Sequence, residues 1–249
     1  TSSNGHQPFA DNGGRYTIAF NGEVFNFQTL RADLEAKGHT FRSTSDTEII
    51  LRLYTLKGPA FLHDLNGFFA LAIHDAQDDT LFLARDRFGV KPLLWSEVDG
   101  RFLFSSELRS LLALGAGREQ DPVSARQYFA YYYIPAPDTV FKGAHKLLPG
   151  HSIHVDKSGV RVERWYDVVA ASQQVKKSAD PEKTLFELMD DAVRLRLLSD
   201  VPLGAFLSGG VDSSAVVALM AEASRDPVKT CSIGFDVGAL DETGYARQV

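Results

Sequence analysis

A run of glycine, serine and aspartate at positions 208–214 has the composition of an anion-binding loop. The run, Ser208-Gly209-Gly210-Val211-Asp212-Ser213-Ser214, separates an apolar segment at 203–207 from a helical pattern at 212–224. Glycines at a strand-to-helix turn let the backbone come close to a ligand, and the N–H groups and dipole of the following helix attract a negative group. The serine hydroxyls add donors, and Asp212 can hold a divalent cation against phosphates.

The same residues also fit a plain glycine turn with serine N-caps. Their place at the carboxyl end of a first parallel strand favours ligand binding, because open α/β sheets bind ligands there. The run has neither the lysine of a Walker loop nor the third glycine of a dinucleotide fingerprint. It therefore predicts a pyrophosphate site rather than a γ-phosphate-transferring NTPase or an NAD enzyme.

Three polar groups nearer the start of the chain have simple local interpretations. Asn21-Gly22 lies between two strand-like segments and predicts a type I′ hairpin turn, which leaves Glu23 as a solvated strand carboxylate. Ser45-Asp46-Thr47-Glu48 precedes an apolar helix and predicts a capping box, with Ser45 as N-cap and Glu48 reaching back to it. The charged run at 85–92 predicts a polar turn whose charges hold the architecture rather than do chemistry.

The elements that must position these residues follow two different patterns of predicted secondary structure, one in each part of the chain. Up to about residue 162 the pattern predicts strands at 16–20, 81–84, 93–95 and 101–104, a hairpin turn at Asp99-Gly100, and helices at 27–37 and 46–56. After Pro181 it predicts a helix to about 198, a strand at 203–207, a helix at 212–224 and a strand at 230–235. The first pattern is typical of an α+β fold, and the second is typical of the beginning of a parallel α/β sheet.

A polar stretch separates the predicted α+β part of the chain from the predicted α/β part. We predict a first domain at 1–166, a linker at 167–182 and the start of a second domain at 183–249, because 167–182 loses the aromatic residues and gains polar ones.

With these elements in place, the sequence resembles a known family. The loop at 208–214 resembles the PP-loop of ATP pyrophosphatases, and residues 200–214 are similar to glutamine-dependent asparagine synthetases. The first 165 residues agree independently, because six motifs occur in the order found in the glutaminase half of that family. The motifs are Gly-His-Gln-Pro at 5–8, Ile-Ala-Phe-Asn-Gly-Glu-Val-Phe-Asn at 18–26, Ser-Asp-Thr-Glu at 45–48, Leu-Asn-Gly-Phe-Phe-Ala at 65–70, Ala-Arg-Asp-Arg-Phe-Gly-Val-Lys-Pro at 84–92 and Lys-Leu-Leu-Pro-Gly-His at 146–151. The resemblance implies an αββα sandwich of the N-terminal-nucleophile hydrolase type, followed by the start of a PP-loop parallel sheet.

The resemblance also implies roles for particular residues. The Asn21 side chain and the Gly22 N–H would form the oxyanion hole for the glutamine amide. Asn21 and Glu23 would belong to the glutamine pocket, and Asp46 would pair with the α-ammonium of glutamine. The residues that match the ATP site are Leu207, Ser208, Gly209, Gly210, Asp212, Ser213 and, lining the adenine pocket, Ile233, with Asp212 also the expected Mg²⁺ ligand.

The family's amino-terminal cysteine nucleophile is absent from this chain. Cys231, the one cysteine, falls in the predicted second strand of the nucleotide-binding domain and is expected to be a small buried residue. Thr1 is not expected to replace the nucleophile, because it stands only twenty residues before Asn21 and no site is set up around it. The arginine-bearing segment that holds the glutamine carboxylate in the family would also precede residue 1. We interpret the chain as a fragment cut at both ends and expect it to be inactive by itself.

The composition gives no support for several other classes of protein, including nucleic-acid-binding, membrane and disulfide-rich proteins. The 249 residues are 44% apolar and 23% charged, with a formal net charge of -6, so nothing favours binding to nucleic acid or an anionic membrane. No apolar run approaches the ~18 residues that span a bilayer, and residues 1–15 do not show the pattern of an export signal, so we expect a soluble protein that is not exported. One cysteine excludes a disulfide framework and a thiolate zinc site, and we expect a cytoplasmic protein.

The expected activity of the intact protein follows from the resemblance. Glutamine would supply ammonia to an aspartyl-adenylate made from aspartate and ATP with Mg²⁺, giving asparagine, AMP and pyrophosphate. The assembly considered with this activity is a homodimer. The alternatives are a relative of β-lactam synthetase, an amidotransferase for a cell-envelope or secondary metabolite, and a non-catalytic binding module. The retained Asn21, Gly22, Glu23 and Asp46 argue against a degenerate glutaminase half.

Overall fold

The computed structural model describes residues 5–199, 201–238 and 241–249. Thr1 and Asp200, which entered the sequence argument, lie outside the described residues. The chain forms two compact units, divided between Gln174 and Val175, and each is described by itself.

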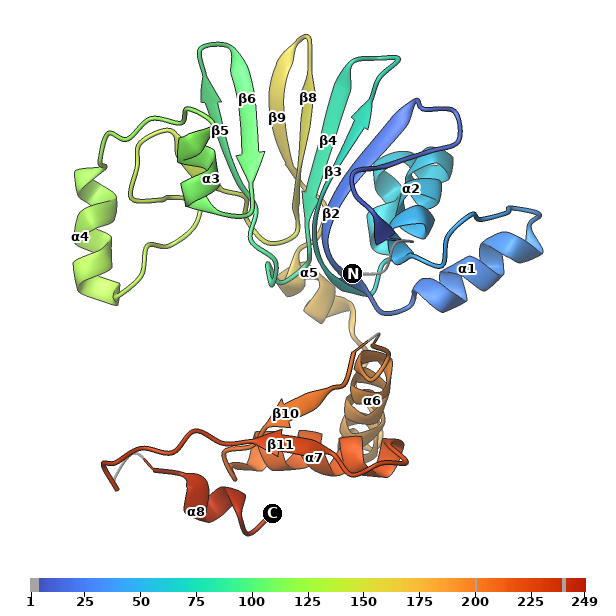
Figure 1. The fold of residues 1–249 in the computed structure, drawn as a ribbon, viewed down its shortest axis with the longest axis vertical. Coiled ribbons are helices and arrows are strands. Elements are labelled where there is room, and N and C mark those ends of the chain that lie inside the picture. The colour runs from blue at the N-terminus through green and yellow to red at the C-terminus, as the bar shows by residue number, and fades with distance from the viewer. Residues whose placement is uncertain (1–4, 200, 239–240) are drawn as a thin grey trace. The chain divides into compact units, whose positions relative to one another are not determined.

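A six-stranded antiparallel sheet is the centre of the amino-terminal unit (Figure 1). Its strands, in spatial order, are β1 (Phe9–Ala10), β2 (Tyr16–Val24), β3 (Gly67–Asp75), β4 (Thr80–Arg85), β8 (His151–Asp156) and β9 (Gly159–Arg164). One face is covered by α1 (Phe27–Ala36), α2 (Asp46–Lys57) and the 3₁₀ helix η2 (Gly58–His63). The core on that face is built from alternate strand residues such as Ile18, Phe69 and Ile73, because every second side chain points to the same face.

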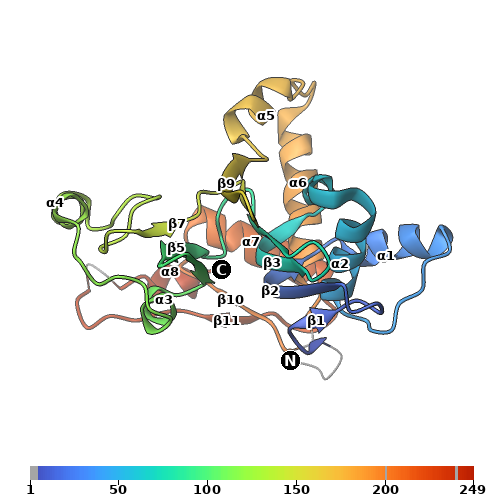
Figure 2. The ribbon, with the colours of Figure 1, turned by 90° about the horizontal axis from the view of Figure 1, so that it is seen from above.

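A second, three-stranded sheet packs on the other face, as Figures 1 and 2 show. Its strands are β6 (Arg101–Ser105), β5 (Leu94–Val98) and β7 (Ala144–Lys146), in that spatial order. Trp95, Phe102 and Phe104 pack against Leu83 and Ile153 of the first sheet. Helix α3 (Leu108–Ala113) covers the outer face of the second sheet through Leu111, which completes four layers in the order helix, sheet, sheet, helix. The expected αββα sandwich is confirmed.

Local signals explain the ends of several elements. Asp99 and Gly100 have φ angles of 51° and 71° and join β5 to β6, which confirms the predicted hairpin turn. The Ser45 side chain accepts a hydrogen bond from the Thr47 N–H, which confirms it as the N-cap of α2. The other half of the capping box is wrong: Glu48 accepts from the N–H and hydroxyl of Ser43 and from the N–H of Arg42, because the chain folds back beside the first turn of α2.

Three further helices complete the description of these segments. The first, α4 (Pro122–Tyr131), lies between β6 and β7 in the chain. The second, α5 (Val168–Gln174), lies within the stretch expected to be a linker. The third, α6 (Pro181–Arg196), opens the carboxy-terminal unit and is capped by Asp180.

The carboxy-terminal unit contains the predicted order of strand, glycine turn, helix and strand. Strand β10 (Gly204–Phe206) is followed by α7 (Val211–Ala223) and β11 (Lys229–Cys231), and the two strands pair in parallel. Both strands are shorter than predicted, and α8 (Thr243–Ala246) follows. Among the residues that the structure describes, none of the helices has the length and apolar character needed to cross a bilayer.

Candidate functional site

The Asn-Gly pair does not form the predicted turn. Asn21 and Gly22 lie inside β2, where they pair with Ala70 and Phe69 of β3. A Cβ atom at position 22 would stand 2.2 Å from the Phe68 carbonyl oxygen, closer than side chains tolerate. Turn propensity is overridden by a nine-residue strand that pairs along its whole length. Glycine is required here because two strands approach closely, and not because the chain reverses.

The N–H group of Gly22 points away from β3. N–H groups two residues apart on a strand face the same side. The Phe20 N–H donates to Gln7 Oε1 at 2.5 Å, and the Val24 N–H donates to Asp46 Oδ2 at 3.2 Å, so both face the edge of β2 opposite β3. The Gly22 N–H lies between them and faces the same edge, where β1 pairs only with Thr17 and Ile18 among the described residues. A backbone donor that the ladder does not use is what an oxyanion hole requires.

The side chains of Asn21 and Glu23 lie on the opposite face from the helices. Both are exposed, and they alternate with Val24, which is buried in the core against α2. Asn21 Nδ2 donates to the Ser106 hydroxyl at 3.2 Å, just beyond the end of β6. Glu23 lies directly opposite Phe68 in the β2–β3 ladder.

Asp46 brings a carboxylate to the same end of β2. It opens α2, is half-buried, and accepts the Val24 N–H through Oδ2. Burial raises the pKa of Asp46 above its ordinary value, and hydrogen bonds from the Val24 and Thr47 N–H groups oppose that shift. A partly desolvated carboxylate favours a cationic ligand. The structure thus brings together Asn21, Gly22, Glu23 and Asp46 where β2 ends.

The charged run at 85–92 has the architectural role expected of its central residues. Asp86 is 1% exposed, and its carboxylate accepts the N–H groups of Phe69, Phe88, Val90 and Lys91 at 3.0 to 3.2 Å. Arg85 donates to the carbonyl groups of Gly89, Lys91 and Leu147, and Arg87 donates to those of His63 and Leu65. These bonds fix the connection between the two sheets beside the end of β2.

The glycine loop of the carboxy-terminal unit is organised by its serines. Ser208 Oγ lies 3.0 Å from Ser213 Oγ and accepts the Gly210 N–H at 3.3 Å. Gly209 has a φ of 80°, and a Cβ there would stand 2.4 Å from the backbone of Tyr245 in α8, so only glycine fits. Helix α7 begins at Val211 with Asp212 in its first turn, and its N-terminus faces this loop.

A cavity of about 240 Å³ lies beside the glycine loop. It is lined by Phe206, Leu207, Ser208, Cys231, Ser232, Ile233, Phe235 and Glu242. Leu207, Ser208 and Ile233 of the predicted ATP site therefore share one cavity, while Asp212 is exposed on α7. Within the described residues no three His, Cys, Asp or Glu side chains are grouped as a metal site. A cavity of about 290 Å³ between the 9–16 segment and α2 contains none of the predicted site residues.

Cys231 is exposed, and the prediction that it is buried is wrong. Cys231 is the last residue of β11, and among the described residues β11 pairs with β10 alone. Cys231 also lines the cavity beside the glycine loop.

Sequence reasoning missed three residues that contact β2 or its partner strand β3. Gln7 fixes the Phe20 N–H, Ser106 accepts from Asn21, and the Lys91 ammonium lies 5.0 Å from the centre of the Phe68 ring. Gln7 and Lys91 lie in two of the recognised motifs, so a motif signal existed for them, whereas nothing in the sequence singled out Ser106.

The fold is an αββα sandwich followed by a unit that begins as a parallel α/β sheet with a glycine loop. Residues 1–166 match the family model described as "Glutamine amidotransferase domain", and residues 184–249 match the model described as "Asparagine synthase". The chain belongs to the family of glutamine amidotransferase domains.

Curated relatives agree with this assignment and confirm the resemblance. The chain is 36% identical over 248 residues to "Asparagine synthetase [glutamine-hydrolyzing] 1" of Bacillus subtilis, which covers 98% of the chain and 39% of that protein. It is also 36% identical to "Putative asparagine synthetase [glutamine-hydrolyzing] 2" of Methanocaldococcus jannaschii, over 93% of the chain and 45% of that protein. The chain thus spans less than half the length of these relatives. A solved structure described as the allosteric regulatory enzyme of purine biosynthesis has a TM-score of 0.49 and 20% identity, over 94% of this chain and 49% of that one.

Proposed function

We propose that the intact protein is a glutamine-hydrolysing, ATP-dependent amidotransferase of the asparagine synthetase kind. Glutamine is hydrolysed at the end of β2, and the ammonia displaces AMP from an aspartyl-adenylate to give asparagine, with pyrophosphate released earlier. The observation that carries this proposal is the edge of β2: the Gly22 N–H faces it, and the Asp46 carboxylate binds the same edge two residues further on.

The residues of this edge have complementary roles toward glutamine. The Gly22 N–H and Asn21 Nδ2 donate to the oxygen that becomes negative when a nucleophile attacks the side-chain amide. Asp46 binds the α-ammonium group, and Glu23 forms a wall of the pocket. The nucleophile itself is assigned, from the family resemblance alone, to a cysteine outside this sequence.

The cavity of the carboxy-terminal unit is proposed to hold ATP. The Gly209-Gly210 backbone and the N-terminus of α7 face the phosphates, Ser208 and Ser213 supply hydroxyl donors, and Leu207 and Ile233 line the base. The cavity supports the fit, because Leu207, Ser208 and Ile233 of the predicted ATP site line it together. When bound, Mg²⁺ would neutralise phosphate charge, and Asp212, in the first turn of α7, would hold it.

The substrates, assembly and location are part of the same proposal. Aspartate is the proposed acceptor, because both curated relatives named above carry the name asparagine synthetase. A cytoplasmic location is proposed from the composition, which includes one cysteine, and a homodimer is proposed from the family resemblance. No role toward nucleic acid or membrane is proposed.

The test uses the full-length protein and glutamine labelled with ¹⁵N in its side-chain amide. The label should appear in asparagine when aspartate, ATP and Mg²⁺ are supplied. Asn21→Ala should lower glutamine-dependent synthesis by roughly 10²- to 10³-fold, the usual cost of one oxyanion donor, and leave synthesis from free ammonia intact. Asn12→Ala, a change on the loop before β2, is the matched control. Labelled product from another carboxylate, with aspartate ignored, would replace aspartate as the acceptor.

A further inference from the structure

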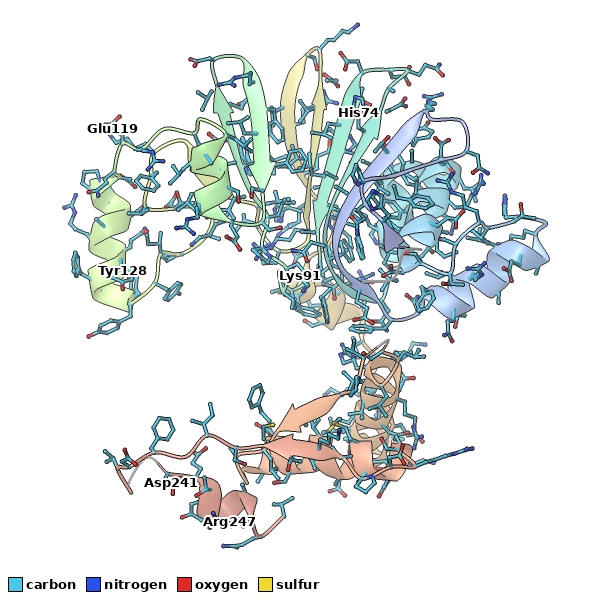
Figure 3. The ribbon with its side chains drawn as sticks, in the orientation of Figure 1. His74, Lys91, Glu119, Tyr128, Asp241 and Arg247 are labelled. Carbon is cyan, nitrogen blue, oxygen red and sulfur yellow. The ribbon has the colours of Figure 1, made fainter. Side chains whose placement is uncertain are left out.

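Lys91 lies at the same end of the sandwich as the proposed glutamine site. It belongs to the connection between β4 and β5, and its ammonium is 5.0 Å from the centre of the Phe68 ring. Phe68 is directly opposite Glu23 in the ladder, and opposed side chains lie on one face about 5 Å apart. Figure 3 shows Lys91 at the end of the sheet where β2 ends and β3 begins.

The backbone around Lys91 is fixed. Its N–H donates to the buried Asp86 carboxylate at 3.0 Å, and its carbonyl oxygen accepts Arg85 Nε at 2.7 Å. The ring of Phe68 then supports the side chain, which is half-buried. A cation held in this way loses little conformational freedom when a ligand binds.

The other cations near this connection are occupied by backbone oxygens. Arg85 and Arg87 donate to carbonyl groups on both sides of the loop, and Lys146 Nζ donates to the Ile134 carbonyl at 2.5 Å. In the described part of the chain, the contact found for the Lys91 ammonium is an aromatic ring. A ring attracts the charge but satisfies none of the three N–H donors in the way an oxygen does. Lys91 therefore retains the capacity to bind an anion.

Glutamine carries an anion that the two carboxylates of the site cannot bind. Asp46 and Glu23 suit its α-ammonium, whereas its α-carboxylate needs a donor of positive charge. We propose that Lys91 binds the α-carboxylate of glutamine and is a specificity-determining residue for the amino acid end of the substrate. This inference rests on the proposed function, and it makes Lys91 a cation additional to the arginine that the family resemblance assigns to a segment outside this sequence.

The experiment compares two substrates that differ only at that carboxylate. Release of ammonia from L-glutamine and from L-glutaminamide is measured with the full-length protein and its Lys91→Met, Lys91→Gln and Lys91→Arg variants. Lys142→Met is the control, because Lys142 pairs with Glu119 in the loop segments around α4. Loss of one charge-assisted bond predicts that Lys91→Met and Lys91→Gln raise the KM for glutamine about tenfold with little change in kcat. Neither variant should alter kcat/KM for L-glutaminamide, and Lys91→Arg should restore most of the loss.

Two results would overturn the inference alone. One is an unchanged KM for glutamine in both uncharged variants, and the other is an equal loss with both substrates, which would mark Lys91 as a structural residue. A wild-type protein that hydrolyses neither substrate would instead overturn the proposed function, and the assignment of Lys91 with it.

Discussion

Gly22→Ala tests the close approach of β2 and β3 that places the proposed oxyanion donor. The new Cβ would stand 2.2 Å from the Phe68 carbonyl oxygen and 2.7 Å from the Phe69 Cα. Both are backbone atoms, so no side chain can rotate away. Because non-bonded heavy atoms rest near 3.5 Å, the strands would have to separate by about 1 Å.

The cost of that separation follows from the ladder. The pairs on either side of Gly22 join Asn21 to Ala70 and Glu23 to Phe68, and their N–H groups face β3. A shift of about 1 Å takes such bonds beyond the 2.7–3.2 Å range in which they are effective. Loss of two to four bonds at about 1 kcal/mol each predicts a loss of about 2–4 kcal/mol in the free energy of unfolding.

Urea unfolding of the 249-residue chain, followed by tryptophan fluorescence, measures this loss. Both tryptophans, Trp95 and Trp165, lie in the amino-terminal unit, so the signal reports on that unit. With a slope of about 2 kcal/mol per molar urea, the midpoint should fall by about 1–2 M. Gly117→Ala is the control, because no atom lies within 4 Å of its Cβ position and its midpoint should stay the same or rise slightly.

A Gly22→Ala midpoint within about 0.3 M of wild type would refute this reasoning, since such a small shift is less than one lost hydrogen bond. Gly67→Ala should cause a similar loss, because its Cβ would stand 2.2 Å from the Glu23 carbonyl oxygen. The double variant should lose less than the two separate losses combined, since both changes push the same strands apart.

Three other predictions follow from the charged residues. The hydrogen bond from Arg15 holds the pKa of Asp75 at about 2, so this group stabilises the fold above the ordinary carboxyl pKa and the stabilisation is lost as pH falls toward 2. Asp75→Asn should therefore lower the urea midpoint at neutral pH, and a difference from wild type that persists unchanged near pH 2 would contradict the assignment. Burial raises the pKa of Asp46, so its protonated form is favoured in the fold and any stability from it is lost as pH rises through that pKa. Asp46→Asn should leave the urea midpoint at neutral pH unchanged or higher. The same change should weaken glutamine binding, measured as an increase in KM of about tenfold or more. A lower midpoint with a normal KM would show a structural role instead. In the full-length protein Asp212→Ala should impair synthesis from both glutamine and ammonia but spare basal glutamine hydrolysis, and an equal fall in hydrolysis would count against two separate sites.

The sequence predicted correctly those features that depend on residues close together in the chain. It failed for features that depend on residues brought together by the fold. Ser45 was recognisable as an N-cap because its partner is two residues away, at Thr47. Glu48 was misassigned because its partners, Arg42 and Ser43, come from a loop whose path returns beside the helix. The Asn21-Gly22 turn was wrong for the same reason, since the residues that extend the strand lie across the sheet, at 69 and 70.

The candidate sites show the same division. The glycine and serine residues of the phosphate loop were predictable because the hydrogen bonds among Ser208, Gly210 and Ser213 span at most five positions. The exposure of Cys231 depends on which strands flank β11, and no short pattern contains that information. Lys91 became a candidate only when the fold placed it over Phe68, a residue 23 positions earlier in the chain.

The edge of β2 explains why a strand, and not a turn, suits the proposed chemistry. A sheet normally consumes backbone N–H groups, and a donor left for a ligand must face an edge. On this edge the Phe20 and Val24 N–H groups are held by the side chains of Gln7 and Asp46, which leaves the Gly22 N–H between two fixed points. Ladder pairing with β3 on the other side keeps the strand from moving, so the donor is oriented before any charge develops. The glycine that permits this close pairing is therefore the same residue that presents the proposed oxyanion donor, so any larger side chain at position 22 would disturb both the pairing and the donor.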